Sequence, residues 1–387
     1  MLLRGGRVMT CVGPELGVID DGAVLVEAGR IAWVGPTAAA PAADEVVELE
    51  GRLVSPGLVD CHTHAIFAGD RAGEFGMRAR GAGYLEIARA GGGIAATTGP
   101  TRAASDDELA RLTEGRIRLA RTTGTTTMEV KSGYDLTVEG ELRLLRVLAT
   151  VAGRVPVDVV PTLLCHVIPA ERQADRGVYV EELCAQLVPR AVGLARSVDV
   201  YCDEGAFTRD ETAAILGAAR VAGLGVRAHV GQFRDLGAAE LLASLGARSV
   251  DHVEQLTPAA IAALAAAGTV AVMLPGACVQ LRLPPPPVAA LRAAGVPLAV
   301  ASDLNPGSSY ASSLPLQMWL ATTHYGMTVE EAWLGVTRIA AQALGLADRG
   351  IVAPGARADL VVWNAEHPAA IPYRYGENLV SQVLTAA

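Results

Sequence analysis

The sequence predicts a parallel (β/α)8 TIM-like barrel with a small β-sandwich domain built from both chain ends. Two observations predict this fold class. Apolar strand-like runs alternate with Ala- and Leu-rich helical runs across residues 55–347, and alternating β patterns occupy both ends of the chain. Regular strand–helix alternation of this kind is typical of a closed parallel barrel, whose active site lies at the carboxyl ends of the strands.

Both ends of the chain are predicted to be β-rich. In residues 1–54, short alternating runs such as 22–27 and 30–34 are separated by Gly- and Asp-rich turns, and no helical pattern is convincing. Residues 348–387 regain β character at 358–363. We therefore expect 1–54 and 348–387 to form one composite β domain, into which the barrel of residues 55–347 is inserted.

The predicted barrel strands are apolar runs bounded by turn residues or by helical patterns. They are 57–60, 125–129, 156–164, 198–201, 225–230, 248–252, 269–274 and 297–302, and the clearest helices between them are 106–122, 138–151, 208–222, 238–245 and 258–267. A doubly wound open sheet is the alternative architecture. That architecture favours a Gly-rich turn after the first strand, and the sequence has none there.

Composition limits the class of protein. The chain is 51% hydrophobic and 19% charged, which predicts a large buried core. Its net charge is −9 and its basic residues do not cluster, so we expect no nucleic-acid partner. No apolar run approaches the ~18 residues needed to span a bilayer. Six scattered cysteines without a C-x-x-C pair, and no signal peptide, favour a cytoplasmic protein with reduced thiols and no membrane partner.

Histidines gather at the predicted strand ends. His62 and His64 follow the first barrel strand with one residue between them, and side chains at i and i+2 of a strand leave the same face. His166, His229 and His252 lie at the ends of three later strands. A single histidine is usually a structural residue, but five of the seven at one barrel face indicate a metal site.

Asp303 follows the last apolar strand and is the leading carboxylate ligand, although an Asp before Asn305-Pro-Gly could also simply form a turn. Three imidazoles and one carboxylate suit zinc or ferrous iron. They leave a position for water, whose pKa the metal lowers towards ~7. Asp303 would also be near enough to accept that water's proton.

Three other features of the sequence each allow two interpretations. Arg71 could hold a substrate carboxylate at the barrel mouth, or it could be a solvated loop residue. Lys131, just past a strand, could bridge two metals if carboxylated, but a neutralising or structural role is favoured. The glycines at 91–93 could cradle a phosphate, but they lack a preceding strand and a GK[ST] sequence, so a substrate loop is favoured.

The motifs resemble those of the amidohydrolase superfamily. The superfamily resemblance rests on Pro-Gly-Leu-Val-Asp-Cys-His-Thr-His at 56–64, a later strand-end histidine, the late Ser-Asp and Gly-Ala-Arg-Ala-Asp-Leu-Val-Val at 355–362. Within the superfamily the chain is most similar to the imidazolonepropionase family. This similarity covers nearly the whole chain and rests on residues 90–94 with 101–102, 129–134, 165–169, 201–204, 249–252, 302–307 and 373–378.

This resemblance implies hydrolysis of the ring amide of 4-imidazolone-5-propanoate, a small anionic heterocyclic substrate, to N-formimidoyl-L-glutamate in histidine degradation. It implies one Zn²⁺ or Fe²⁺/Fe³⁺ per chain and a homodimer. The implied metal ligands are His62, His64, His229 and Asp303. The implied substrate contacts are Arg71, Tyr134, His166, Gln232, Asn305, Gly307 and Ser308.

The position three after His229 departs from the residue best suited to proton transfer. A glutamate there would be a natural proton shuttle, whereas Gln232 can only form hydrogen bonds. We therefore assign Gln232 to substrate binding and acid–base work to Asp303 and His252. The alternatives are another amidohydrolase of the superfamily, such as a deaminase or amidase with a different small substrate, and a catalytically inactive scaffold. Arg71, Tyr134 and His166 argue against the first, and the complete ligand set argues against the second.

Overall fold

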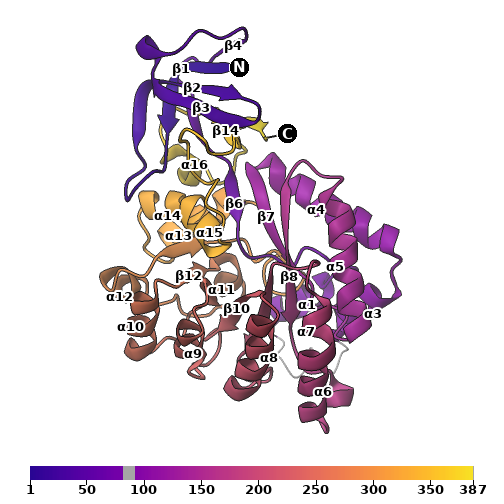
Figure 1. Ribbon diagram of the computed structural model, residues 1–387. Coiled ribbons are helices and arrows are strands. Elements are labelled where there is room, and N and C mark those ends of the chain that lie inside the picture. Colours follow the sequence, from indigo (N-terminus) through magenta and orange to yellow (C-terminus); the bar gives the residue numbers. More distant parts are fainter. Residues whose placement is uncertain (82–91, 387) are drawn as a thin grey trace.

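The computed structural model describes residues 1–81 and 92–386, which form two sheets with helices around one of them (Figure 1). The eight-stranded sheet has the order β13-β12-β11-β10-β9-β8-β7-β6, so neighbours in the sequence are neighbours in the sheet, and the described pairs are parallel. This sequential order confirms the predicted barrel and excludes the doubly wound alternative, in which the order reverses.

Each predicted barrel strand is present, with small shifts at its ends. The strands are β6 (Leu58–Asp60), β7 (Thr125–Lys131), β8 (Asp158–Cys165), β9 (Ser197–Cys202), β10 (Gly225–Val230), β11 (Ser249–His252), β12 (Val270–Met273) and β13 (Leu298–Val300). The first and last strands meet through a parallel bridge between Thr63 and Leu304. The Asp303 amide also donates to the His62 carbonyl over 3.0 Å, so barrel closure itself joins two predicted metal ligands.

The five helices expected from the sequence are α4 (Asp106–Thr122), α5 (Val138–Ala152), α8 (Arg209–Val221), α9 (Ala238–Ser244) and α10 (Pro258–Ala267). Their starts follow from local chemistry. Thr208 and Glu211 form a reciprocal capping box at α8, and the Thr257 hydroxyl accepts from the Ala260 amide at α10. Gly268 ends α10 in a left-handed conformation, with φ of 67°.

The remaining helical segments connect or flank the barrel strands, apart from η1 and α16 near the second sheet. They are η1 (Thr37–Ala39), α1 (Ala72–Ala79), α3 (Ala95–Ala103), η2 (Ala170–Arg172), α6 (Arg176–Glu182), η3 (Leu183–Leu187), α7 (Val188–Arg190), α11 (Pro275–Leu281), α12 (Val288–Ala293), α13 (Leu314–Thr323), α14 (Val329–Gly335), α15 (Arg338–Ala343) and α16 (Ala370–Tyr373). The single turn η1 lies in the segment that the sequence predicted to lack helices. No helix within 1–81 and 92–386 combines the length and apolar character needed to cross a bilayer.

The second sheet combines both ends of the chain, as predicted. Its strands are β1 (Leu2–Met9), β2 (Val18–Glu27), β3 (Arg30–Pro36), β4 (Val46–Glu48), β5 (Leu53–Pro56), β14 (Leu360–Trp363) and β15 (Val380–Leu384). The two ends join where β14 pairs antiparallel with β5, and Figure 1 shows both termini at this sheet. The residue limits of the two domains remain a prediction.

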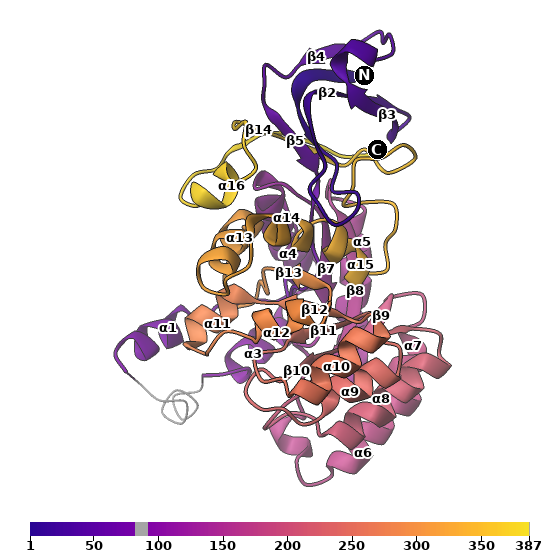
Figure 2. The same ribbon diagram turned by 90° about the vertical axis from the view of Figure 1, so that its left-hand side faces the viewer.

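The sheet packs against the amino-terminal end of the barrel (Figure 2). Trp363 of β14 and Trp333 of α14 meet edge to face, with ring centroids 5.7 Å apart. Gly124, just before β7, passes so close to Trp363 that a Cβ atom there would lie 3.1 Å from the ring. The carboxyl ends of the barrel strands, where the predicted site residues lie, therefore face away from this contact.

Candidate metal centre and substrate site

Four predicted ligand atoms converge where the barrel closes. His62 and His64 follow β6, His229 is in β10, and Asp303 follows β13. The Nε2 atom of His64 lies 3.2 Å from that of His62 and 3.3 Å from that of His229. The Oδ1 atom of Asp303 lies 3.4 Å from the Nε2 atoms of both His62 and His64. All four side chains are buried.

These donors fit a metal ion. The Nδ1 atoms of His62 and His229 lie 2.6 Å and 2.8 Å from the carboxylates of Asp251 and Asp199, so they donate there and the Nε2 lone pairs face the common centre. Two tetrahedral ligands bonded at about 2.1 Å would lie about 3.4 Å apart, close to the separations observed. Without a cation, the lone pairs and the Asp303 carboxylate would repel one another.

Burial and the neighbouring charges keep most of the ligands in the state that a metal requires. Burial lowers the pKa of His64, and it lowers that of His229 well below its usual value. Burial and Lys131 lower the pKa of His62, but Asp251 and Asp303 together outweigh them and leave that pKa raised. Burial alone would raise the pKa of Asp303, yet His62 and His64 hold it well below its usual value.

His252 lies beside the ligands, as its predicted catalytic role requires. Its ring centroid is 5.4 Å from that of His229 and 5.9 Å from that of His62. Within the described part of the chain its Nδ1 atom has no hydrogen-bond partner. His252, Val253 and Asp303 all have positive φ, at 80°, 67° and 49°. Such backbone strain in non-glycine residues clusters at functional sites.

Tyr134 and His166 form the next layer of the site. The His166 ring stacks on His64 with centroids 5.6 Å apart, and Tyr134 packs edge-on against His166 at 5.5 Å. The Nδ1–H group of His166 donates to the Gly133 carbonyl over 3.0 Å. Burial lowers the pKa of His166 to about 3 and raises the pKa of Tyr134. Both groups are therefore neutral near pH 7.

Arg71 approaches the loop after β13, but it is already paired. Its Nε and Nη2 atoms donate to the two oxygens of Glu74 over 2.9 and 2.7 Å. Its Nη1 atom faces Gly307, where a Cβ atom would lie only 2.3 Å away. Gly307 must therefore be glycine for Arg71 to keep this position. The Gly93 amide also donates to Glu74 over 2.8 Å, whereas Gly91 of the predicted substrate loop lies outside the described residues.

Two further predicted substrate contacts, Asn305 and Gln232, already form hydrogen bonds within the protein. The Asn305 amide group donates to the Asp303 carbonyl and to Ser308 Oγ, and its Oδ1 accepts from the Gly307 and Ser308 amides. Its side chain thus holds the loop that carries the predicted contacts. The Gln232 Oε1 atom accepts from the Tyr201 hydroxyl over 2.9 Å.

Sequence reasoning missed the carboxylates that orient the ligands. Asp199 and Asp251 are fully buried and hold His229 and His62. Asp199 stands between two valines, and Asp251 stands between a valine and His252, each inside a short buried strand. Because isolated charges are rarely buried without a partner, that pattern was a usable signal.

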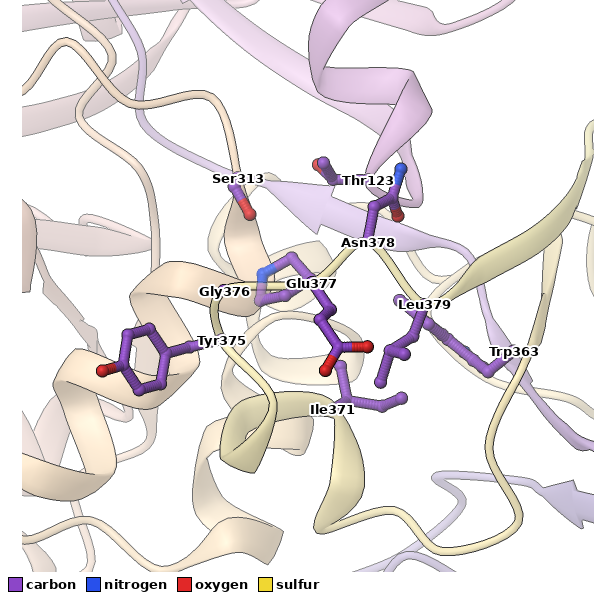
Figure 3. Close-up of a pocket in the computed structure, with 10 residues that line it drawn as sticks. Thr123, Ser313, Trp363, Ile371, Tyr375, Gly376, Glu377, Asn378 and Leu379 are labelled. Carbon is purple, nitrogen blue, oxygen red and sulfur yellow. The ribbon is translucent and has the colours of Figure 1, made fainter.

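A cavity lies elsewhere, between the second sheet and the barrel, and Figure 3 shows its lining. Tyr375 and Asn378 belong to the motif at 373–378. Tyr375 stacks on Trp319 at 3.9 Å, and the Asn378 amide donates to the Thr122 carbonyl at the end of α4. This motif therefore fastens the carboxyl-terminal segment to the barrel. No predicted site residue lines the cavity.

Known proteins resemble the chain along nearly its whole length. A profile of the amidohydrolase family matches residues 69–382, and one of an imidazolonepropionase-like composite domain of bacteria matches residues 22–43. An imidazolonepropionase of Rhizorhabdus wittichii is 47% identical over 97% of this chain and 96% of its own. One of Paracoccus denitrificans is 49% identical over 94% of this chain and 92% of its own.

Solved structures share the fold at lower identity. A zinc-complexed atrazine chlorohydrolase of Arthrobacter aurescens is 16% identical, with a TM-score of 0.74 over 100% of this chain and 94% of that one. An N-isopropylammelide isopropylaminohydrolase of Burkholderia multivorans is 22% identical, with a TM-score of 0.72 over 100% and 96%. These two similarities concern the fold alone. With the curated relatives at 47–49% identity over almost the full length, the chain belongs to the imidazolonepropionase family of amidohydrolases.

Proposed function

We propose that this chain hydrolyses the cyclic amide of 4-imidazolone-5-propanoate to N-formimidoyl-L-glutamate in histidine degradation. The relatives that carry the name imidazolonepropionase support the substrate. The observation that carries the chemistry is the convergence of three imidazoles and one carboxylate at the carboxyl end of the barrel. In this reaction water adds to the ring carbonyl carbon, the ring C–N bond breaks, and the leaving nitrogen takes a proton.

We assign the metal to His62, His64, His229 and Asp303. A zinc or iron ion held there would lower the pKa of a water molecule towards ~7 and so supply the nucleophile at neutral pH. The Asp303 carboxylate is the acceptor for the proton of that water, because it is buried beside the ligand nitrogens and holds its negative charge. Asp303 or His252 then returns a proton to the leaving nitrogen.

Substrate orientation falls to residues around this centre. Arg71, with Nη1 towards Gly307, is assigned to the propanoate carboxylate together with Tyr134 and Ser308. Neutral His166 and Gln232 are assigned to the imidazolone ring of the substrate, because each side chain can both donate and accept hydrogen bonds. Asn305 would act indirectly, by holding the loop that carries Gly307 and Ser308, because its side-chain amide is already hydrogen-bonded to that loop. A deaminase of neutral heterocycles would not need the arginine.

Arg71→Ala should mainly raise KM, by about tenfold to a hundredfold, because one charge-assisted hydrogen bond is worth about 1.5–3 kcal/mol. The change in kcat should be small, since the carboxylate is bound equally in the ground and transition states. Steady-state kinetics with the purified variant test this. Arg80→Ala is the matched control, because Arg71 directly precedes α1 and Arg80, which is exposed, directly follows it. An unchanged KM in Arg71→Ala would remove the carboxylate role.

The purified protein should carry about one zinc or iron per chain, since four donors meet at a single centre. Elemental analysis measures this, and dialysis against a chelator should remove activity that added metal restores. A chain that holds no metal or two ions contradicts the assignment. We further propose a cytoplasmic homodimer, on the family resemblance; sedimentation analysis tests the dimer.

The decisive test of function is an ultraviolet assay of imidazolonepropanoate loss after metal reconstitution. The product should be N-formimidoyl-L-glutamate by mass spectrometry. A deaminase or unrelated amidase of the same superfamily would leave this substrate unchanged.

A further inference from the structure

A buried group of charges lies directly beside the metal ligands. The Lys131 ammonium is fully buried, with its Nζ atom 2.8 Å from both Glu129 Oε1 and Asp199 Oδ2 and 3.7 Å from Asp251 Oδ2. Arg227 completes the group, because its Nη2 atom lies 2.9 Å from Asp251 Oδ2. Two of these carboxylates, Asp199 and Asp251, are the ones that orient His229 and His62.

The same carboxylates form a second set of potential metal donors. One ligand atom each from His62, Asp199 and Asp251 lies within 4.8 Å of the others, a spacing that could hold an ion. The Lys131 ammonium, however, contacts both aspartates of this set. A lysine side chain thus stands where carboxylate oxygens would otherwise collect a hard divalent cation.

The charges of this ion-pair group fit a single divalent ion. Glu129, Asp199 and Asp251 contact two cations, Lys131 and Arg227, which leave one negative charge unbalanced. The Asp303 carboxylate of the ligand set adds a second. One divalent ion on the histidines balances both, whereas a second ion beside Lys131 would leave an excess of positive charge in a buried site.

The identity of the buried cation sets it apart from the other basic residues of the chain. Of the 32 basic residues in the chain, Lys131 alone is lysine. An ammonium is a compact point charge with three donors, whereas the planar guanidinium fork needs more room. Every other basic position of the chain is arginine, and the single lysine stands where three carboxylates crowd a fully buried cation.

We propose that Lys131 occupies the place of a second metal ion, so that its side chain limits the centre to one metal while its ammonium holds Asp199 and Asp251 against the ligand histidines. Lys131 is thus a positioning residue, which acts through Asp199 and Asp251 and does not touch the substrate. The inference rests on the proposed metal centre at His62, His64 and His229.

The test counts two different metals in variants of the full chain. Wild type, Lys131→Ala and Lys131→Met are loaded with zinc, and the unbound zinc is removed. Each protein is then exposed to Mn²⁺, which prefers oxygen ligands and does not displace zinc from imidazoles. Lys131→Ala removes both the charge and the side chain that fills the space. Lys131→Met removes the same charge but keeps a side chain of similar length.

Elemental analysis should find about one zinc in all three proteins, and about one additional manganese only in Lys131→Ala. The melting temperature of Lys131→Ala should rise with Mn²⁺ concentration, because an ion that binds only the folded state stabilises it, while wild type should not respond. Wild type without zinc would instead refute the proposed metal centre.

Three results would overturn the inference itself. The first is zinc without manganese in Lys131→Ala, which would mean that no ion fits the vacated space. The second is manganese uptake by Lys131→Met as readily as by Lys131→Ala, which would mean that the side chain does not fill that space. The third is a Lys131→Ala protein that stays unfolded at every Mn²⁺ concentration while Lys131→Met folds, which would mean that an ion cannot replace the side chain.

Discussion

Asp303→Asn should abolish turnover, with kcat falling by about a thousandfold or more. The carboxylate lies 3.4 Å from the Nε2 atoms of two ligand histidines, so the substitution removes the anionic ligand and the proton acceptor together. Asparagine keeps the size of the side chain but cannot accept a proton near neutral pH. Steady-state kinetics and metal content are measured on the same preparation, which separates loss of the ion from loss of proton transfer.

Asp359→Asn is the matched control, because Asp359 is also a buried aspartate, ion-paired with Arg357, but lies just before β14 of the second sheet. It should cost stability and leave kcat close to wild type. Loss of a proton-transfer group typically lowers kcat by about 10²–10⁴-fold. An Asp303→Asn variant that retained a tenth or more of the wild-type kcat would therefore show that Asp303 is neither a metal ligand nor the proton acceptor.

Strand ends explain why much of the site was predictable. In a parallel barrel, the carboxyl ends of all strands lie at one face, so His62, His229 and Asp303 could be grouped without knowledge of their distances. Backbone pairing then sets those distances, as the hydrogen bond from the Asp303 amide to the His62 carbonyl shows. The strand order followed from the same alternation of strands and helices.

Contacts between side chains were not predictable in this way. Glu74, in the first turn of α1, binds Arg71 just before that helix, and nothing in the local pattern reveals which partner an arginine will bind. The resemblance implies that Asn305 contacts substrate, but nothing in the sequence shows that its amide also bonds its own loop. The pairing of Asp251 with His62 joins residues 189 positions apart, and only the closed barrel brings them together.

Asp251→Asn should weaken metal binding by about 10- to 100-fold and lower the free energy of unfolding by about 3–5 kcal/mol. Asp251 accepts from His62 Nδ1 over 2.6 Å and from Arg227 over 2.9 Å, and it is fully buried. An asparagine there could still orient the imidazole, but it would leave Arg227 without its close anion in a site that water does not reach. Chelator competition measures the affinity, and denaturant unfolding of the metal-free protein measures the stability.

Ser249→Ala separates the charge of Asp251 from its packing. The Ser249 hydroxyl donates to Asp251 Oδ1 over 3.0 Å, so its removal deletes one hydrogen bond to the carboxylate and leaves the charge in place. The expected loss is about 1.5–3 kcal/mol of stability, the range for a hydrogen bond to a charged group, with metal affinity within a few-fold of wild type. Equal losses of affinity in the two variants would mean that packing around β11, rather than the Asp251 charge, makes His62 a ligand. Unchanged affinity in Asp251→Asn would leave the orientation of His62 to the barrel backbone alone.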